Sequence, residues 1–249
     1  MTASAVPFEA PYVERHRRAW ARKPGLRWYY QSEIFDRMGA WLPAGPTLEL
    51  GTGPGFFANY RAGMVSTDIT PARDVAVVSD AHALPFPSGN FAAVAALDVV
   101  HHLGNPRRAL GEGARVLRPG GRIVLVEPWP TTLGWLFYRY AHHEACEWVK
   151  TPWEQIMPPG KDPMEGNAAV GRMLFDDGGA ALRAHVPGLR LVHLERFAVA
   201  SYVMTGGLRL WGFPGPLVRA AVAVERMLPG FLMKHLALRA LIVLERVAD

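Results

Sequence analysis

The sequence predicts an α/β protein with a doubly wound parallel β-sheet. Three apolar runs, at 75–78, 91–97 and 122–126, are continuous rather than alternating, as in strands buried on both faces. A fourth run at 47–50 leads into the glycine-rich segment 51–55, a pattern typical of a strand-to-helix turn that binds a ligand. Strands that alternate with turns and helices favour a parallel sheet covered on both faces.

The N-terminal residues 1–44 are predicted to form a helical cap over the ligand site. Apolar side chains such as Trp20 and Tyr30 recur through this segment, and Pro43 ends the helical pattern. A sheet-forming core is expected at 45–128. Its strands are expected at 47–50, 64–67, 75–79, 91–97 and 122–127.

The second half of the chain departs from this pattern. Residues 129–180 are rich in aromatic residues, proline and glycine and lack strand alternation, so they are predicted to be an inserted lid over the substrate. Residues 181–249 return to the sheet, with strands expected at 189–200 and 238–247 and a helix at 215–234. A length of 249 residues favours one domain rather than two.

The composition bears on the partners and the location of the protein. The net charge is +5, but the arginines are scattered and the lysines number only four, so no nucleic-acid partner is predicted. The one basic cluster, at 15–23, is interpreted as a solvated helix face, with a phosphate or lipid contact as the alternative. The single Cys146 and an N-terminus unlike a signal peptide favour a reducing cytoplasm. No apolar run reaches the roughly 18 residues of a membrane-spanning helix.

Acidic residues stand at the ends of the expected strands. Glu49 lies in the first strand, and Asp68 follows the second. Asp80 and Asp98 follow the third and fourth. Ligands of open α/β sheets bind outside the carboxyl ends of the strands, so these side chains should meet at one site. Asp68 comes 19 residues after Glu49, where a carboxylate can accept hydrogen bonds from both ribose hydroxyls of a nucleoside.

These motifs come in the order found in class I S-adenosylmethionine (SAM) methyltransferases. The glycine loop GTGPG at 51–55 is followed by DAHALPF at 80–86, HHL at 101–103 and RVLRPGG at 115–121. The set most resembles the UbiE-like, or type 11, branch of that family. The resemblance implies a Rossmann-like sheet of seven strands that are mostly parallel, with an antiparallel last strand. It also implies SAM as cofactor and S-adenosylhomocysteine as product.

The resemblance also implies cofactor contacts. In this family the aspartate that matches Asp80 binds the adenine amino group, and the following backbone N–H, here of Ala81, meets the ring. Carried over position by position, the resemblance places these residues against the cofactor: Tyr30, Glu49, Gly51, Thr52, Gly53, Gly55, Asp68, Ile69, Asp80, Ala81, His82, Leu97 and Asp98.

The first two crossovers are unusually short. Eight residues separate Gly55 from Met64 and six separate Asp68 from Val75, whereas a crossover usually needs about ten or more. The first two helices are therefore expected to be reduced to about one turn. One face of the sheet is then less covered, and either the N-terminal helices or a partner subunit is expected to cover it.

Two histidine pairs supply candidate catalytic groups. His101 and His102 follow the fourth strand, near the expected methyl group, and either is a candidate base because histidine titrates near neutral pH; packing and pocket lining are the alternative. His143 is a third candidate, oriented by Glu144 or Glu147, because on a helix His143 and Glu147 share a face. A purely structural helix is the alternative there. No metal site is predicted, because no second half-site accompanies the pair.

The reaction expected from these residues is methyl transfer to a small molecule. Aromatic residues flank the expected acceptor position, which favours a bulky apolar or aromatic acceptor methylated at oxygen, with nitrogen or carbon as alternatives. Two rivals stay open: use of SAM in another reaction, such as a cyclisation, and a non-catalytic SAM-binding scaffold. The apolar tail after residue 209 is expected to pack on the sheet, with peripheral membrane contact or a homodimer face as alternatives.

Overall fold

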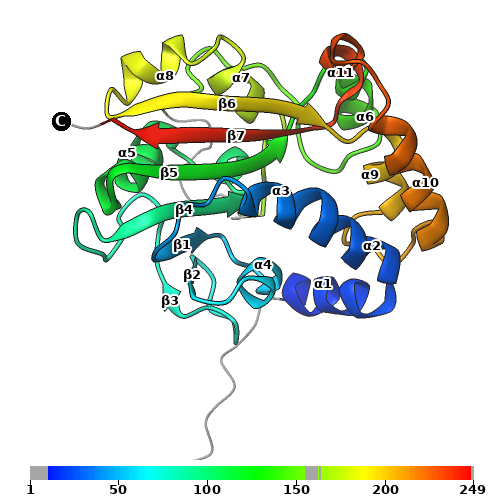
Figure 1. The fold of residues 1–249 in the computed structure, drawn as a ribbon, viewed down its shortest axis with the longest axis horizontal. Helices are drawn as coiled ribbons and strands as arrows, with labels where there is room; N and C mark the ends of the chain where they lie inside the picture. The colour runs from blue at the N-terminus through cyan, green and yellow to red at the C-terminus, as the bar shows by residue number, and fades with distance from the viewer. Residues whose placement is uncertain (1–10, 155–161, 163, 248–249) are drawn as a thin grey trace, which may run out of the picture.

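A seven-stranded β-sheet forms the centre of the protein (Figure 1). The computed structural model describes residues 11–154, 162 and 164–247. Its strands are β1 (Thr47–Leu50), β2 (Met64–Asp68), β3 (Val77–Val78), β4 (Phe91–Leu97), β5 (Leu117–Pro128), β6 (Leu189–Phe197) and β7 (Arg239–Arg246). They lie in the order β3-β2-β1-β4-β5-β7-β6. Neighbours from β3 to β5 are parallel, and β7 runs antiparallel between β5 and β6, which confirms the expected fold class.

Strand boundaries follow the expected ones most closely in the middle of the sheet. β1 and β4 have the expected residues, and β2 is longer by Asp68 alone. The strand expected at 75–79 is reduced to the two residues of β3, which pairs with β2 only at its end. β5 begins at Leu117 rather than at residue 122, and β6 ends at Phe197 rather than at residue 200.

The helix expected at 215–234 is wrong as a single element. The chain forms two helices there, α10 (Gly215–Glu225) and α11 (Gly230–Leu236). Pro229 precedes α11 in an extended conformation. A proline has no backbone N–H and its ring clashes with the preceding helical turn, so a continuous helix through this position is disfavoured.

The N-terminal helices cover the sheet face that the short crossovers leave open. α4 (Phe56–Tyr60) has only five residues, and the chain between β2 and β3 contains no helix. The N-terminal helices are α1 (Pro11–Arg22), α2 (Pro24–Tyr29), a π-helix (Tyr30–Phe35) and α3 (Asp36–Gly39). In Figure 1, α3 lies in front of the sheet, and α1 and α2 lie to the right of its central strands. Leu26, Ile34 and Met38 are buried in one cluster with strand residues such as Val124 and Leu241. The face is therefore covered from within the chain.

The other face of the sheet carries α5 (Pro106–Val116), α7 (Val170–Phe175) and α8 (Ala180–His185). Leu110, Leu174 and Leu182 of these helices form a second buried cluster with the strands. Two further helices, α6 (Gly134–Tyr140) and α9 (Ala200–Thr205), follow β5 and β6 at their carboxyl ends. Among the described residues, no helix has the length and apolar character needed to cross a bilayer. Residues 1–10 of the expected helical cap, and 155–161 and 163 of the expected insertion, lie outside the described part.

Candidate active site

A cavity of about 1530 Å³ lies at the carboxyl ends of the central strands. Of the residues that the sequence placed at the cofactor or named as bases, the following line it: Tyr30, Glu49, Gly51, Thr52, Gly53, Asp68, Ile69, Asp80, Ala81, His82, Leu97, Asp98, His101, His102 and His143. Gly55 is not among the lining residues. A Cβ on Gly55 would lie 2.4 Å from Cβ of Asp74, so this glycine is needed for packing against Asp74.

The glycine loop after β1 places backbone that carries no side chains at the edge of the cavity. Gly51 and Gly53 have φ angles of 64° and 50°, in the left-handed region that favours glycine. A Cβ on Gly51 would lie 2.5 Å from Cγ2 of Val99, whereas a Cβ on Gly53 would meet nothing within 4 Å. The loop therefore packs closely on one side and leaves open space on the other. This arrangement fits a nucleoside cofactor that approaches the backbone.

Asp68 is tied to the same loop. One oxygen of its carboxylate accepts a hydrogen bond from the N–H of Gly53 at 2.9 Å, and the other accepts from the N–H of Thr70 at 2.8 Å. Both bonds orient the carboxylate at the end of β2. Asp68 and Asp80 line one cavity, as the sequence predicted for a shared nucleoside site.

Glu49 is buried beneath the loop. Burial is the main cause that raises its pKa, and the nearby charge of Asp68 adds to the rise. A hydrogen bond from Thr52 Oγ1 at 2.5 Å opposes it, and the resulting pKa is about 7. A carboxyl with this pKa changes its charge close to neutral pH. Its charge state is therefore sensitive to a cationic ligand in the cavity.

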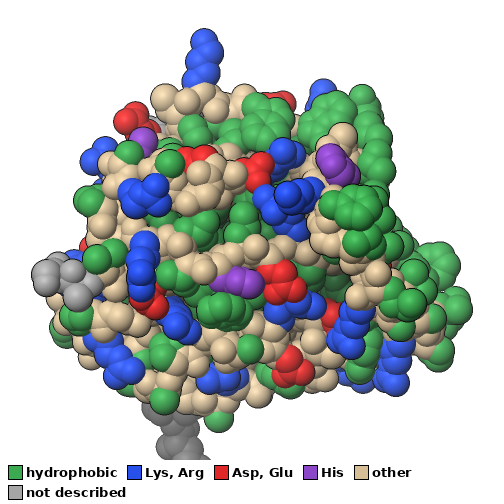
Figure 2. Space-filling view, turned by 45° about the horizontal axis from the view of Figure 1, so that its top comes forward, with side chains coloured by type: hydrophobic (Ala, Val, Ile, Leu, Met, Phe, Trp, Pro, Cys, Tyr) green, Lys and Arg blue, Asp and Glu red, His purple; other side chains and the backbone are tan. Residues whose placement is uncertain are grey.

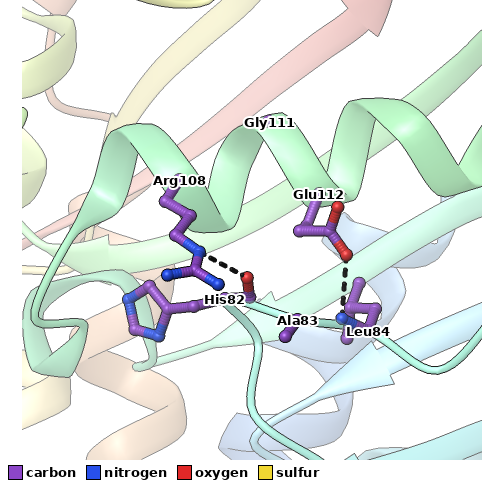
Figure 3. A pocket seen from close by; sticks show the side chains of 6 residues that line it. All are labelled: His82, Ala83, Leu84, Arg108, Gly111 and Glu112. Atoms are coloured by element: carbon purple, nitrogen blue, oxygen red, sulfur yellow. Dashed lines mark hydrogen bonds between the residues drawn. The ribbon is translucent and has the colours of Figure 1, made fainter.

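Asp80 and His82 are held together at the end of the third strand. Nδ1 of His82 lies 2.6 Å from Oδ1 of Asp80, which also accepts from the backbone N–H of His82. Burial raises the pKa of Asp80, but the contacts with His82 outweigh it and lower the pKa below its usual value. As Figure 3 shows, Arg108 of α5 donates to the carbonyl of His82, and Glu112 accepts from the N–H of Leu84. Helix α5 thus fixes the loop that carries Asp80.

The structure reveals a buried cation that the sequence did not place at the site. Arg239, at the start of β7, is 1% exposed, and its Nη2 lies 2.7 Å from Oδ1 of Asp98. Its guanidinium also lies 5.0 Å from the ring centre of Tyr202. Burial raises the pKa of Asp98, and the charge of Arg239 opposes that rise. The available signal was an arginine inside an apolar strand, since a buried charge requires a partner.

His101 is buried between two carboxylates. Glu127 accepts from Nδ1 of His101 at 2.6 Å and from the backbone N–H of Val100 at 2.8 Å. Burial lowers the pKa of His101, but Glu127 and then Glu144 raise it to about 10. With no ion bound, His101 therefore carries its proton at neutral pH, which argues against its predicted role as a base. Burial lowers the pKa of the neighbouring His102 to about 4, so that imidazole is neutral.

The helix assumed for the second histidine cluster is wrong. Helix α6 ends at Tyr140, and the chain that follows it is not helical, so the shared face of His143 and Glu147 does not exist. Glu144 instead turns toward the first pair, with its oxygens 3.4 Å from Nε2 of His101 and 3.5 Å from Nε2 of His102. His143 has a side chain that is 62% exposed, 3.8 Å from Glu144. A turn, rather than a helix, brings the two clusters together.

Comparisons with known proteins agree with this geometry. Residues 48–125 match the type 11 methyltransferase family, described as a methyltransferase domain. The chain is 32% identical over 146 residues to an uncharacterized 37.1 kDa transposon protein of Streptomyces fradiae, covering 50% of this chain and 40% of the relative. It is 41% identical over 68 residues to the 27-O-demethylrifamycin SV methyltransferase of Amycolatopsis mediterranei, covering 27% and 24%. The chain thus spans less than half the length of these relatives.

The fold has counterparts among solved structures. A SAM-dependent methyltransferase from Thermotoga maritima superposes with a TM-score of 0.52 over 95% of this chain and 96% of its own. At 15% identity, this likeness supports the fold alone. The fold, the order of the motifs and the family match lead to one conclusion. Residues 48–125 of this chain match a methyltransferase domain, and the fold that surrounds them is shared with a SAM-dependent methyltransferase of known structure.

Proposed function

We propose that this protein transfers the methyl group of SAM to the oxygen of a bulky apolar or aromatic small molecule. The observation that carries the proposal is that one cavity joins the strand ends at Asp68 and Asp80 to an apolar region. Phe137, Val203 and Trp211 line that region. At about 1530 Å³ the cavity is larger than the roughly 300–1,000 Å³ of ordinary small-molecule sites, which leaves room for an acceptor beside the cofactor. The oxygen specificity of the rifamycin relative supports oxygen as the methylated atom.

The residues of the site would mainly position the reactants. Bound SAM supplies a methyl group already activated by its sulfonium, so the protein has to hold acceptor oxygen, carbon and sulfur in line. The loop around Gly53, with Asp68 and Asp80, would hold the nucleoside. The expected lid role of 129–180 is supported by cavity-lining residues from that segment, among them Phe137 and Glu144. The predicted cytoplasmic location stays a prediction.

Cofactor binding can be measured directly. Isothermal titration of SAM and S-adenosylhomocysteine should give one site per chain. Replacing Asp68 by Asn should weaken it about 10–100-fold, because a hydrogen bond to a charged group contributes about 1.5–3 kcal/mol. Asp36→Asn is the matched control, since Asp36 is exposed on α3. Equal affinity in both variants would contradict the assignment.

Methyl-labelled SAM separates the proposal from its rivals. Label should appear in the product when acceptors with phenolic or alcoholic hydroxyls are supplied. Turnover without label transfer would support a cyclisation or a related reaction. SAM binding without any turnover would support a scaffold.

His143 is the remaining candidate base. It lines the cavity and is the most exposed of the three predicted bases, whereas His101 is already charged and His102 is a weak base. His143→Ala should lower kcat while SAM affinity is unchanged, with a loss of about 100-fold or more if it takes the acceptor proton. His235→Ala is the matched control, because His235 does not line the cavity. An unchanged kcat would remove His143 from the mechanism.

We also propose that the surface around α10 and α11 contacts an anionic membrane. Figure 2 shows hydrophobic side chains along the right edge, the end that Figure 1 assigns to these helices. Large apolar side chains are exposed here: Leu210, Trp211, Phe213, Leu217, Val224, Met227 and Phe231. Residues 206–236 contain four Lys or Arg and a single acid, Glu225. Apolar residues flanked by positive charge favour lipid over a second copy of the same basic surface.

A further inference from the structure

Three potential metal ligands converge in the cavity. Among the described residues, Nε2 of His101, Nε2 of His102 and the carboxylate of Glu144 lie within 4.8 Å of one another. All three residues line the cavity beyond the end of β4. Two come from the short 3-10 helix after β4, and the third comes from the turn after α6. The sequence did not predict the set, because its members belong to two clusters about 40 residues apart.

The distances within this group suit a shared ion better than direct hydrogen bonds. Glu144 lies 3.4 Å from His101 Nε2 and 3.5 Å from His102 Nε2. Hydrogen bonds between charged groups are usually about 2.7–2.9 Å long. Ligands about 2.0–2.2 Å from a tetrahedral metal are separated by roughly 3.3–3.5 Å. Glu144 faces His101 through Oε2 and His102 through Oε1, and each of the two spacings matches that of two neighbouring ligands around an ion.

His101 is already oriented as metal-binding histidines are. Its Nδ1 faces Glu127 at 2.6 Å, while Nε2 points toward Glu144. Glu127 is fixed in turn, because its other oxygen accepts from the backbone N–H groups of Val99 and Val100. A carboxylate on the far nitrogen holds the ring and makes the near nitrogen a better ligand.

A two-residue segment of the chain holds both halves of the group in place. A Cβ on Gly166 would lie 2.7 Å from Cδ2 of His101 and 2.9 Å from Cε1 of His102, so only glycine permits this packing. The next residue, Asn167, donates from its backbone N–H to the carbonyl of His101 at 2.9 Å. Its side chain both donates to and accepts from the backbone of Glu147. Gly166 thus packs against both imidazoles, and Asn167 holds the chain that carries Glu144 through hydrogen bonds.

We propose that His101, His102 and Glu144 bind one divalent transition-metal ion, with its open positions facing the cavity. Two imidazoles and one carboxylate are ligands that Zn²⁺, Co²⁺, Fe²⁺ and Mn²⁺ accept. Mg²⁺ and Ca²⁺ prefer oxygen ligands and are excluded by the imidazoles. The rival explanation is that a proton on His101 alone neutralises Glu144, with no ion.

The test uses the full chain without a polyhistidine tag, stripped of metal by a chelator and free of SAM. Titration with CoCl₂ should produce visible absorption that saturates at one equivalent, and ZnCl₂ should abolish that absorption by competition. MgCl₂ should do neither. Because neither SAM nor an acceptor is present, failure here would leave the proposed methyl transfer untouched. Wild-type protein with no saturable cobalt absorption would overturn the metal site.

Two variants assign the ligands. Glu144→Gln keeps the shape of the side chain, and His102→Gln removes one imidazole; each should weaken zinc binding by about 100-fold or more. His235→Gln lies outside the cavity and should bind zinc as the wild type does. Circular dichroism and thermal unfolding, measured in parallel, show whether each variant is folded. Wild-type zinc affinity in folded Glu144→Gln would refute the assignment.

Discussion

Buried charges occur in pairs at the carboxyl edge of the sheet. Arg239 faces Asp98, and His101 faces Glu127; Arg239, His101 and Glu127 are almost closed to solvent, whereas the side chain of Asp98 is 31% exposed. Removal of one partner from such a pair leaves an uncompensated charge, which costs far more than loss of a surface pair. These residues are therefore expected to affect stability as well as ligand binding.

Replacing Arg239 by Gln should destabilise the protein by about 3–5 kcal/mol, because Asp98 loses its counter-ion. Chemical denaturation of the purified variants measures this change. Arg190→Gln is the matched control, since Arg190 pairs with Glu245 at an exposed position and should cost about 1 kcal/mol or less. A double variant, Arg239→Gln with Asp98→Asn, should recover part of the loss. Similar losses in the two single variants would mean that the buried pair has no special weight.

Glu49 should make stability depend on pH. Burial raises its pKa from 4.5 to about 7, so the folded state holds this proton more tightly than the unfolded state. The corresponding stabilisation is complete below pH 4.5 and is lost as pH rises through about 7. Glu49→Gln removes the cost of ionisation, so its stability relative to wild type should increase by on the order of 3 kcal/mol between pH 4.5 and 8. Denaturation at several pH values checks this, and a constant difference would contradict it.

At the scale of the elements, the sequence predicted best what local patterns determine. The continuous runs that form β1 and β4 lie in the middle of the sheet and are buried, so their boundaries could be read from residue type. The length expected for β3 was wrong, because an edge strand pairs on one side only and the pattern of hydrophobic residues does not reveal which strand lies at the edge. The single helix expected at 215–234 was wrong because Pro229, which is visible in the sequence, interrupts it.

The residues of the site also fall into two groups, those that the sequence could place and those that it could not. The glycine loop and the acids Asp68 and Asp80 could be placed because the end of a strand fixes where its next residue lies. Arg239 and Glu144 could not, since both reach the cavity through long-range contacts between segments more than 40 residues from their partners in the sequence. His143 and Glu147 were assigned one face on the assumption of a helix that does not form.

The N-terminal helices should contribute to the stability of the fold through the side chains that they bury against the sheet. Leu26 of α2 is buried against the sheet cluster, so Leu26→Ala should cost about 2–5 kcal/mol. Leu217→Ala, the same substitution at an exposed position of α10, should cost less than about 1 kcal/mol. Thermal unfolding compares the two. Equal, small losses would show that these helices are dispensable.

At the scale of the whole molecule, the apolar surface and the cavity are continuous. Leu210 and Trp211 belong both to the exposed apolar surface and to the cavity lining. An apolar acceptor could therefore pass from a bilayer into the cavity without crossing water, which links the proposed acceptor class to the proposed membrane contact.

Vesicle binding tests this link. Wild-type protein should sediment with vesicles that contain phosphatidylserine, and less so as salt is raised. Met227 and Phe231 are 84% and 65% exposed, and replacing both by Glu should reduce the bound fraction about tenfold or more. Val78→Glu, at an exposed site on edge strand β3, is the control. If the double variant instead converts a dimer to a monomer and wild type ignores vesicles, the surface is a subunit interface.

The position of β7 has a consequence for biosynthesis. This strand enters between β5 and β6, and its first residue supplies the guanidinium that faces Asp98. A nascent chain on the ribosome holds every glycine and acid of the nucleoside pocket long before it holds Arg239. The carboxylate of Asp98 therefore stays without this partner until translation has passed β7.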